Sequence, residues 1–361
     1  MKIKNVLWIV ILVITQNNVA QNFAGRVSNI NVKLLNQVQF WDINEESDLY
    51  QISNQFQINY LPNRNTSINI NTSYSSSEVM TKKLSGLTDL QIQLSQKVKS
   101  INTVFDVGIN LPTGKSSLTN SEFASTILLS RNVFNFRNPV LGQGTNIFIG
   151  ASWAEEVSEN FVIGAGLSYQ IRGEYQPFEK QDSKYKPSNE LLVSGGVDLR
   201  IDKSNTLSAD IVGIFFNEDK VDGNVVFTAG NRFIYSLGYK QYFNNNVLRI
   251  TARYRYSAED ELQNLAAVTN EKFTSNYFML AFSFYHSVSR LVSIQYNFEA
   301  KFFEETLKLY SGYSSFSPGV IFFFEVTNRF EIPLHVKYIL GSKEGSTING
   351  IDTGIGINLK F

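Results

Sequence analysis

Alternation of apolar and polar residues, repeated along almost the whole chain, is the feature that most restricts the fold. In residues 291–302 every second side chain from Val292 onward is apolar, and the side chains between these are polar or charged. Successive side chains of a β-strand point to opposite faces, so this period of two predicts strands. The pattern recurs at 191–201, 247–256 and 329–338, with weaker copies at 66–75, 88–98, 103–111, 146–153, 161–172, 206–216, 232–243 and 277–285.

The length and the polar face of these segments favour strands whose apolar side faces outward. They run for about 10 to 12 residues, whereas strands of soluble proteins usually have about 5 or 6 and tilted membrane-spanning strands about 9 to 11. The polar face also carries full charges in mid-strand, such as Glu299, Arg253 and Asp198. A soluble sandwich would bury its apolar face, but charges on the other face suit a water-filled barrel interior.

Aromatic residues mark the ends of the apolar faces. The chain has 28 Phe and 17 Tyr. Aromatic rings form girdles at the two membrane–water interfaces of outer-membrane barrels. The residues expected in these girdles are Tyr169, Tyr254, Tyr256, Phe302, Tyr338 and Phe361.

The connections between the strands alternate between short and long, which is the asymmetry of outer-membrane barrels. The short ones are rich in Asn, Ser and Asp, which favour tight turns. They are expected at 62–65, 99–102, 155–160, 202–205, 244–246, 287–289 and 327–328. The long ones are expected near 76–86, 113–144, 174–188, 217–228, 258–273, 304–315 and 341–350.

Counting the strands gives an all-β fold, a transmembrane antiparallel up-and-down β-barrel of about 16 strands. Seven hairpins supply fourteen of them, the C-terminal segment adds one, and residues 28–40 add another. The alternative is a barrel of 14 strands in which residues 21–48 partly form a plug rather than wall. An even count places both chain ends on the periplasmic side.

The C-terminal sequence DTGIGINLKF predicts how the barrel closes. Its apolar residues Ile355, Ile357, Leu359 and Phe361 alternate with small or polar ones. A last strand of this kind closes against the first, so that no unpaired edge faces lipid. The terminal Phe361 resembles the signal that the barrel-assembly machinery of Gram-negative bacteria reads, which implies that machinery as a partner beside the lipid bilayer.

The N-terminal residues predict export to the cell outer membrane. Lys2 and Lys4 precede an unbroken apolar run from Val6 to Ile14, which is too short to span a bilayer but fits a signal peptide over residues 1–20. Residues 21–361 then form the barrel domain.

Composition excludes some classes of function. The 32 basic and 32 acidic residues balance, which argues against a nucleic-acid partner. The chain has no cysteine, so thiolate chemistry, disulfides and cysteine-bound metals are excluded.

Residues 86–115, GLTDLQIQLSQKVKSINTVFDVGINLPTGK, resemble a known family. The segment has a Gly-x-x-Asp strand start, a hairpin, and a strand that ends in Leu-Pro-Thr-Gly. It is similar to outer-membrane proteins linked to the phenol (meta-cleavage) degradation pathway, which are close to the long-chain fatty-acid transporters. The resemblance implies passive uptake of small, often hydrophobic molecules. The alternative is structural: Pro112 ends a strand and Gly114 permits a tight turn.

Catalytic chemistry has few candidates in this sequence. His286 adjoins a predicted periplasmic turn, and His335 lies on a polar face between Glu331 and Lys337. His335 could serve as a general base, but no serine near either histidine lies in a nucleophile motif. We predict no catalytic residue, no metal and no cofactor, and we expect Asp198 and Asp210 to pair with arginines on neighbouring strands.

Charged residues on the polar face are candidates for lining the lumen. Three arginines on one strand and two basic residues in phase on the preceding strand form a basic wall that could attract anions. Alternatively, these charged side chains only cross-link one another across a water-filled interior. The candidates are Arg249, Arg253, Arg255, Lys240, Arg232, Asp198, Arg200, Asp210, Glu299, Lys301, Glu331, His335 and Lys337.

The long connection at 113–144 is a candidate constriction loop. Its aromatic residues Phe134 and Phe136 could fold into the barrel and narrow it. The leading hypothesis is therefore a porin-like outer-membrane channel or transporter for passive diffusion of small molecules, hydrophobic or anionic. One alternative is a structural or adhesive barrel without transport, and another is an outer-membrane hydrolase.

Overall fold

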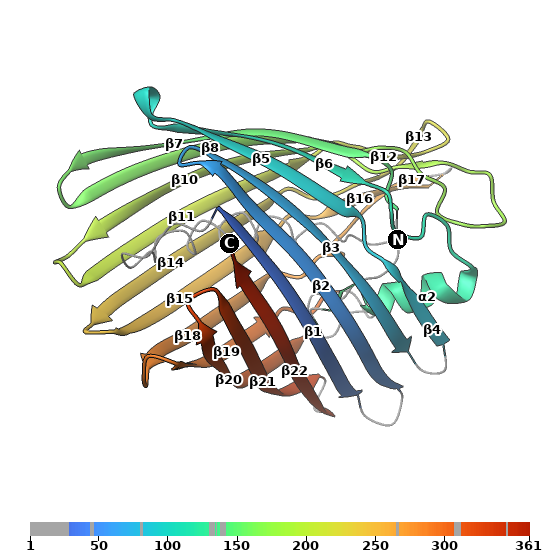
Figure 1. The fold of residues 1–361 in the computed structure, drawn as a ribbon. Coiled ribbons are helices and arrows are strands. Elements are labelled where there is room, and N and C mark those ends of the chain that lie inside the picture. Colours follow the sequence, from blue (N-terminus) through green and yellow to red (C-terminus); the bar gives the residue numbers. More distant parts are fainter. Residues whose placement is uncertain are drawn as a thin grey trace.

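Sixteen antiparallel strands form a closed barrel among the described residues of the computed structural model (Figure 1). The structure describes residues 29–43, 47–79, 82–129, 134, 136–137, 142–264, 267–306, 312–343 and 346–361. The predicted signal peptide at 1–20 lies outside these residues, as do residues 21–28 and 44–46 of the segment considered as a plug.

The wall strands follow one another in chain order, and each pairs antiparallel with its neighbours. They are β1 (Ile30–Ile43), β2 (Ser47–Asn63), β3 (Thr66–Val79), β5 (Leu90–Val98), β6 (Thr103–Leu111), β7 (Asn146–Ser158), β8 (Phe161–Ile171), β10 (Glu190–Arg200), β11 (Asn205–Phe216), β14 (Arg232–Phe243), β15 (Asn246–Ser257), β18 (Tyr277–Ser287), β19 (Val292–Phe303), β20 (Tyr313–Thr327), β21 (Phe330–Lys343) and β22 (Ser346–Lys360). The prediction of an up-and-down barrel of 16 strands is confirmed. The 14-strand alternative is wrong, because residues 30–43 are wall.

The last strand closes the barrel against the first, as the C-terminal alternation predicts. β1 and β22 pair without interruption from Asn31↔Lys360 to Ile43↔Ile348. At the chain end, the Phe361 amide donates to the Ile30 carbonyl at 2.8 Å, and the Ile30 amide donates to the Phe361 carbonyl at 3.2 Å. The seam therefore leaves no row of unpaired amides toward lipid, where each would cost several kcal/mol.

The short turns lie at one end of the barrel, at the left of Figure 1, and the start of β1 lies there beside the end of β22. Local chemistry shapes these turns. Asn102 and Asn244 adopt the left-handed conformation that Asn tolerates, with φ of 50° and 53°. The Asp202 carboxylate accepts hydrogen bonds from Asn205 Nδ2 at 2.7 Å and from the Ser204 backbone amide at 2.7 Å. These bonds, the one from the Asn205 side chain first, lower the pKa of Asp202 to about 2.

The connections at the opposite end are longer and contain structure of their own. Five short strands form a second sheet in the order β17-β16-β13-β12-β9. They are β9 (Tyr185–Lys186), β12 (Glu218–Val221), β13 (Asn224–Thr228), β16 (Asp260–Asn264) and β17 (Ala267–Glu271). β4 (Lys82–Leu87) continues the pairing of β3, and helix α2 (Asn120–Leu129) lies beside it (Figure 1). The 3-10 helix η1 (Lys99–Ile101) belongs to a short turn.

Two predicted long connections are wrong. In 76–86, β3 and β4 continue through most of the segment and leave only residues 80–81 between them. The segment 341–350 contains Gly, Ser and Asn residues, yet β21 and β22 continue through most of it and leave only residues 344–345 between them. These strands have 14 and 15 residues, so they extend beyond what crossing a bilayer requires. Backbone pairing with the neighbouring strands overrides the weak strand propensity of these residues.

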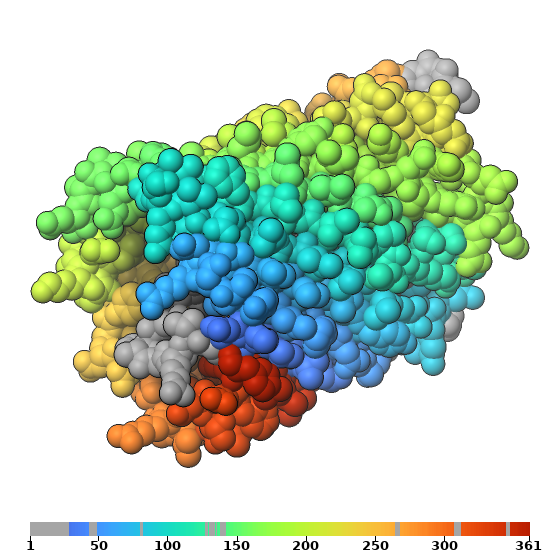
Figure 2. Space-filling view, turned by 45° about the horizontal axis from the view of Figure 1, so that its top comes forward, coloured from blue at the N-terminus to red at the C-terminus, as the bar shows by residue number. Residues whose placement is uncertain are grey.

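The orientation of the side chains is that of a membrane barrel. Tyr296 and Phe298 are 46% and 39% exposed, whereas the side chains of Glu299 and Lys301, which have the opposite parity on the same strand, are 26% and 11% exposed. The same alternation places exposed apolar residues on one face of each neighbouring strand, including Leu280, Ile250, Leu237, Ile211 and Val193. The space-filling view shows the strands packed side by side as a wall, hollowed at the end that carries the short turns (Figure 2).

Candidate functional site

The interior of the barrel is the candidate functional site, and alternation places all thirteen predicted lumen residues on inward-pointing positions. On β15, Arg249 and Arg253 alternate with the exposed Ile250 and Tyr254. The register brings Arg249 beside Lys240 of β14, and Arg253 Nε donates to Ser236 Oγ of the same strand at 3.3 Å. The predicted basic wall therefore exists as a geometric arrangement on β14 and β15.

Acidic side chains face the same interior from β10 and β11, the two wall strands that precede β14. Asp198 lies on β10, and Asp210 lies on β11 in register with Ser236 of β14. The expected pairing with arginines is wrong: among the described residues, neither carboxylate has an Arg nitrogen within 4.0 Å. Arg253 instead bonds to Ser236 of the neighbouring strand β14, and Arg255 bonds to the Ser275 carbonyl. Arg200, at the short-turn end of β10, donates from Nη1 to the Glu159 carbonyl at 3.3 Å.

Glu299 is the centre of a compact charged cluster on the wall of β19 to β21. Its Oε1 lies 2.9 Å from Lys301 Nζ and accepts a hydrogen bond from Lys337 Nζ at 3.2 Å. One carboxylate thus binds two ammonium groups, so the cluster carries a net positive charge. Glu331, nearer the short-turn end, accepts from Asn358 Nδ2 at 2.6 Å.

His335 takes part in a polar network that the alternation of the sequence does not predict. Its Nε2 lies 3.0 Å from Oδ1 of Asp352 on β22, rather than bonding to Glu331. The same Asp352 oxygen accepts from Gln37 Nε2 at 2.8 Å, and Gln37 Oε1 accepts from Gln55 Nε2 at 2.9 Å. The network ends in the long loop, where Arg137 Nη2 donates to Gln55 Oε1 at 2.7 Å.

The predicted constriction residues Phe134 and Phe136 pack against the inner wall. Their rings lie 4.8 and 6.4 Å from the Trp41 ring of β1, measured between centroids. Both belong to an apolar cluster on the inner side of β1 to β4 and β20 to β22, whose buried members are Trp41, Leu49, Val79, Leu84, Leu118, Leu129, Phe134, Phe136, Tyr313, Ile339 and Ile348.

Gln51 of β2 holds this loop to the wall by binding the peptide groups of Arg137. Gln51 Oε1 accepts from the Arg137 amide at 2.7 Å, and Gln51 Nε2 donates to the Arg137 carbonyl and, at 2.7 Å, to Ser77 Oγ. Gln51 is fully buried, so these bonds replace all of its contact with water.

Helix α2 anchors the beginning of the same loop through a capping box. The Thr119 amide donates to Glu122 Oε2 at 2.9 Å, and the Glu122 amide donates to Thr119 Oγ1 at 3.3 Å. Lys115 Nζ adds an ion pair to Glu122 at 2.6 Å. Burial alone would raise the pKa of Glu122, but the hydrogen bonds from Lys115 and Thr119 outweigh it and lower that pKa.

Two predicted lumen residues, Arg232 and Arg255, point inward but are covered rather than water-exposed, which differs from the prediction. Each is 1% exposed. The Arg232 guanidinium lies 4.7 Å from the Phe216 ring and donates to Thr274 Oγ1 at 3.4 Å. Arg255 lies 4.5 Å from the Tyr277 ring and donates to the Ser275 carbonyl at 3.0 Å. The segment after β17 therefore covers this part of the wall.

A buried ion pair near the long-loop end was not anticipated from the sequence. Arg172 Nη2 donates to Glu190 Oε1 at 2.5 Å, and both side chains are 3% exposed. Arg172 is the last residue of the predicted segment 161–172, and Glu190 directly precedes the segment 191–201, so the period of two does not single out either residue. The register of β8 and β10 pairs Glu190 with Gln170, and Arg172 follows two residues later with the same parity.

The residues that carry the family resemblance lock a turn at the end of β5 and β6. The Asp89 carboxylate accepts from the Gly114 amide at 3.1 Å and from the Gln143 amide at 3.3 Å. A Cβ on Gly114 would lie 2.9 Å from Asp89 Oδ1 and 3.0 Å from the Leu87 carbonyl, so only glycine fits. This motif therefore has a structural explanation in the contacts it makes.

Catalytic or metal-binding arrangements do not stand out in the described part of the chain. His286 Nδ1 contacts Asn246 Oδ1 at 2.8 Å beside a short turn. No serine or threonine hydroxyl among the described residues bonds to the His335 ring. The described residues contain no group of three or more His, Asp or Glu side chains that could hold a metal ion. None of the described helices is long and apolar enough to cross a membrane.

A closed barrel with an apolar outside and a charged inside defines a transmembrane β-barrel protein. Its 16 strands, short turns on the side of the chain ends and long connections opposite place it in the outer membrane. No known protein-family profile matches the chain, so the resemblance of residues 86–115 is not confirmed at the level of a family. No curated protein matches it either.

Solved structures with a similar architecture are outer-membrane barrels of varied activity. OprB of Pseudomonas putida has a TM-score of 0.46 at 10% identity, with 92% of each chain covered. OprD of Pseudomonas aeruginosa has a TM-score of 0.46 at 7% identity, covering 92% of this chain and 95% of that one. The translocator domain of the autotransporter NalP from Neisseria meningitidis has a TM-score of 0.39 at 7% identity, covering 98% and 95%. Such distant likenesses concern the fold and do not select a function.

Proposed function

We propose that the protein is a passive channel of the outer membrane for small solutes. The observation that carries this proposal is the inner face of the barrel, where Arg249, Arg253, Asp198, Asp210 and the Glu299 cluster point inward in mid-wall. A barrel of about 16 strands encloses a space wider than its own side chains fill, and charged walls keep that space hydrated.

The loop that carries Phe134 and Phe136 would set the width of the channel at the long-loop side. Phe134 and Arg137 of this loop are held to the wall by Trp41 and Gln51, so this part of the loop would be a fixed narrowing. The mixed charges would admit ions and polar solutes of either sign, while the basic side chains of β14 and β15 would favour anions on their side of the path.

Conductance of the purified protein in a planar lipid bilayer tests this proposal. We expect stepwise current increments in the presence of the protein, since each inserted barrel adds one water-filled path. Absence of any current above that of the bare bilayer, with insertion verified by protease protection, would favour a structural or adhesive barrel instead.

The hydrolase alternative has a separate test. It would rest on the His335–Asp352 pair, the only histidine–carboxylate contact among the described residues. Lipid and peptide hydrolysis by the same preparation, compared with His335→Gln, would support an enzyme only if the wild type cleaves and the variant does not.

Recognition of Phe361 by the barrel-assembly machinery stays a prediction. Removal of Phe361 tests it: the yield of protein inserted into the outer membrane should fall.

A further inference from the structure

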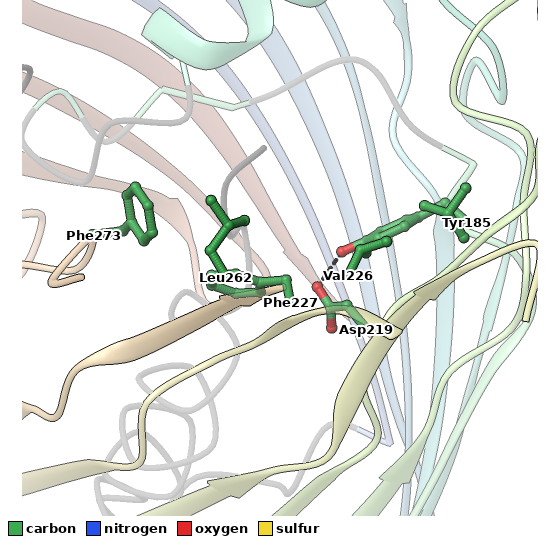
Figure 3. A pocket seen from close by; sticks show the side chains of 7 residues that line it. Tyr185, Asp219, Val226, Phe227, Leu262 and Phe273 are labelled. Atoms are coloured by element: carbon green, nitrogen blue, oxygen red, sulfur yellow. Dashed lines mark hydrogen bonds between the residues drawn. The ribbon is translucent and has the colours of Figure 1, made fainter. Parts of the chain in front are cut away.

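A cavity of about 260 Å³ lies among the short strands at the long-loop end of the barrel. Its walls come from β9, β12, β13 and β16 and from the segment after β17 (Figure 3). The lining residues are Tyr185, Asp219, Val221, Val226, Phe227, Leu262 and Phe273. The cavity is therefore separate from the charged wall and from the loop that carries Phe134.

The walls of this cavity are mostly apolar and aromatic. Phe227 and Leu262 are cross-strand partners of β13 and β16, and the Phe227 and Phe273 rings lie 6.1 Å apart between centroids. On the β9 side, the Tyr185 ring packs edge-on against Tyr175 at 5.6 Å. An apolar cavity of about 150 Å³ is enough to bind benzene. This larger cavity therefore has room for an aromatic ring with a short substituent.

Asp219 is the one charged residue in the lining. Its carboxylate accepts a hydrogen bond from the Tyr185 hydroxyl, drawn in Figure 3, and another from the Ser188 amide at 2.7 Å. Burial, followed by the nearby Asp219 charge, raises the pKa of Tyr185, so its hydroxyl remains a donor. In the described part of the chain, no Lys, Arg or His nitrogen lies within 4.0 Å of the Asp219 carboxylate.

This carboxylate sets the chemistry that the cavity can accept. A carboxylate offers about four lone-pair sites, and two of the Asp219 sites are used by Tyr185 and Ser188. The remaining acceptor capacity suits a ligand with an N–H or O–H group. A second carboxylate in the same apolar space would be repelled, since neither charge would be compensated.

We propose that this cavity binds a small, largely apolar molecule that carries one hydrogen-bond donor, a hydroxyl or an amine, and that it rejects carboxylates. The inference deepens the proposed function, and it rests on that function only in treating the bound molecule as a solute of the channel. The cavity would then collect such molecules from outside the cell next to the barrel mouth.

Isothermal titration calorimetry of the full, detergent-solubilised chain tests the site with three probes of nearly equal size: benzyl alcohol, benzylamine and benzoate. We expect saturable binding of the alcohol and the amine, and binding of benzoate at least tenfold weaker. Benzoate binding as tight as that of the alcohol, or no saturable binding by any probe, would overturn the proposal.

Two tryptophan substitutions on one hairpin separate binding in the cavity from binding elsewhere. Leu262→Trp places a large ring in the cavity and should abolish saturable binding of benzyl alcohol. Val268→Trp is the matched control, because Val268 pairs with Gln263 on the other face of the same β16–β17 hairpin and is exposed. It should bind as the wild type does. Equal binding by both variants would contradict the site.

Asp219→Asn tests the charge separately from the shape. It should bring the affinities for benzoate and benzyl alcohol within a factor of about three of each other, whereas unchanged discrimination would remove Asp219 from the proposal.

Bilayer conductance of the same preparations distinguishes the proposed binding site from the proposed channel. Binding without conductance supports the site and removes the channel, and conductance without binding overturns the site and leaves the channel.

Discussion

His335 Nε2 of β21 lies 3.0 Å from Asp352 Oδ1 of β22, on the inner face of the barrel. The imidazole reaches this position by lying against Gly354, its own cross-strand partner. A Cβ on Gly354 would come within 2.5 Å of His335 Cε1 and 2.6 Å of the Asn36 backbone carbonyl. The His335–Asp352 contact therefore depends on the absence of a side chain at position 354.

Gly354→Ala should lower the free energy of unfolding by about 1–3 kcal/mol, since the added methyl group must displace a ring and a backbone carbonyl in a packed wall. Urea unfolding in detergent, followed by heat-modified mobility on gels, measures this change. Gly195→Ala on β10 is the control, because its Cβ would meet atoms no closer than 3.9 Å. Equal stability of the two variants would show that position 354 is not restricted.

Loss of the inward loop should widen the channel. Deleting residues 120–138 removes α2, Phe134 and Phe136, and we expect faster uptake of small sugars into proteoliposomes. Gln51→Ala is a milder form of the same change, because it removes the side chain that binds the Arg137 peptide groups. Gln57→Ala, on the same face of β2, serves as its control. An unchanged rate for the deletion variant would mean that the loop does not narrow the path.

Removing the Glu299 charge should shift ion selectivity toward anions, because Lys301 and Lys337 would then carry uncompensated positive charge on the lumen wall. Reversal potentials in a tenfold salt gradient compare Glu299→Gln with the wild type. Glu159→Gln makes the same charge change at a periplasmic turn and should have no effect. A shift toward cations in Glu299→Gln would contradict the placement of this cluster along the ion path.

Breaking the Arg172–Glu190 pair should destabilise the barrel more than breaking any exposed pair. Glu190→Gln leaves the buried guanidinium without its carboxylate, which typically costs about 3–5 kcal/mol. Glu174→Gln removes the partner of Lys184, where the side chains are 44% and 65% exposed, and should cost no more than about 1 kcal/mol. Denaturant midpoints of the two variants test the difference, and equal midpoints would show that burial does not decide it.

The strands and their orientation could be predicted from the sequence because a residue's parity alone decides whether it faces lipid or the interior. That rule placed Glu299, Lys301 and Arg253 on the inner face. Asp352 carried the same signal: it has the opposite parity to the apolar Ile355 and Ile357. Asp352 is the first residue of the C-terminal segment DTGIGINLKF, so parity alone already places it on the inner face, although it is absent from the predicted lumen residues.

Features built from loops could not be predicted in this way. Whether Phe134 packs against Trp41, or Tyr185 against Asp219, depends on contacts between segments far apart in the chain, and no periodic pattern encodes them. Helix α2 is an exception, since Thr119 and Glu122 form a capping-box sequence that could have indicated its start. The coverage of Arg232 and Arg255 by the segment after β17 likewise follows from tertiary packing alone.

Site-directed thiol modification under voltage clamp tests most directly whether current flows through the interior of this barrel. The chain has no cysteine, so an introduced one reacts without background. Ser283 points inward on β18, and the neighbouring Phe282 is exposed on the outer face. With a water-soluble, positively charged thiosulfonate reagent, Ser283→Cys channels should lose part of their current and Phe282→Cys channels should lose none. Unaffected current in Ser283→Cys, or loss of current in Phe282→Cys, would contradict a conducting lumen.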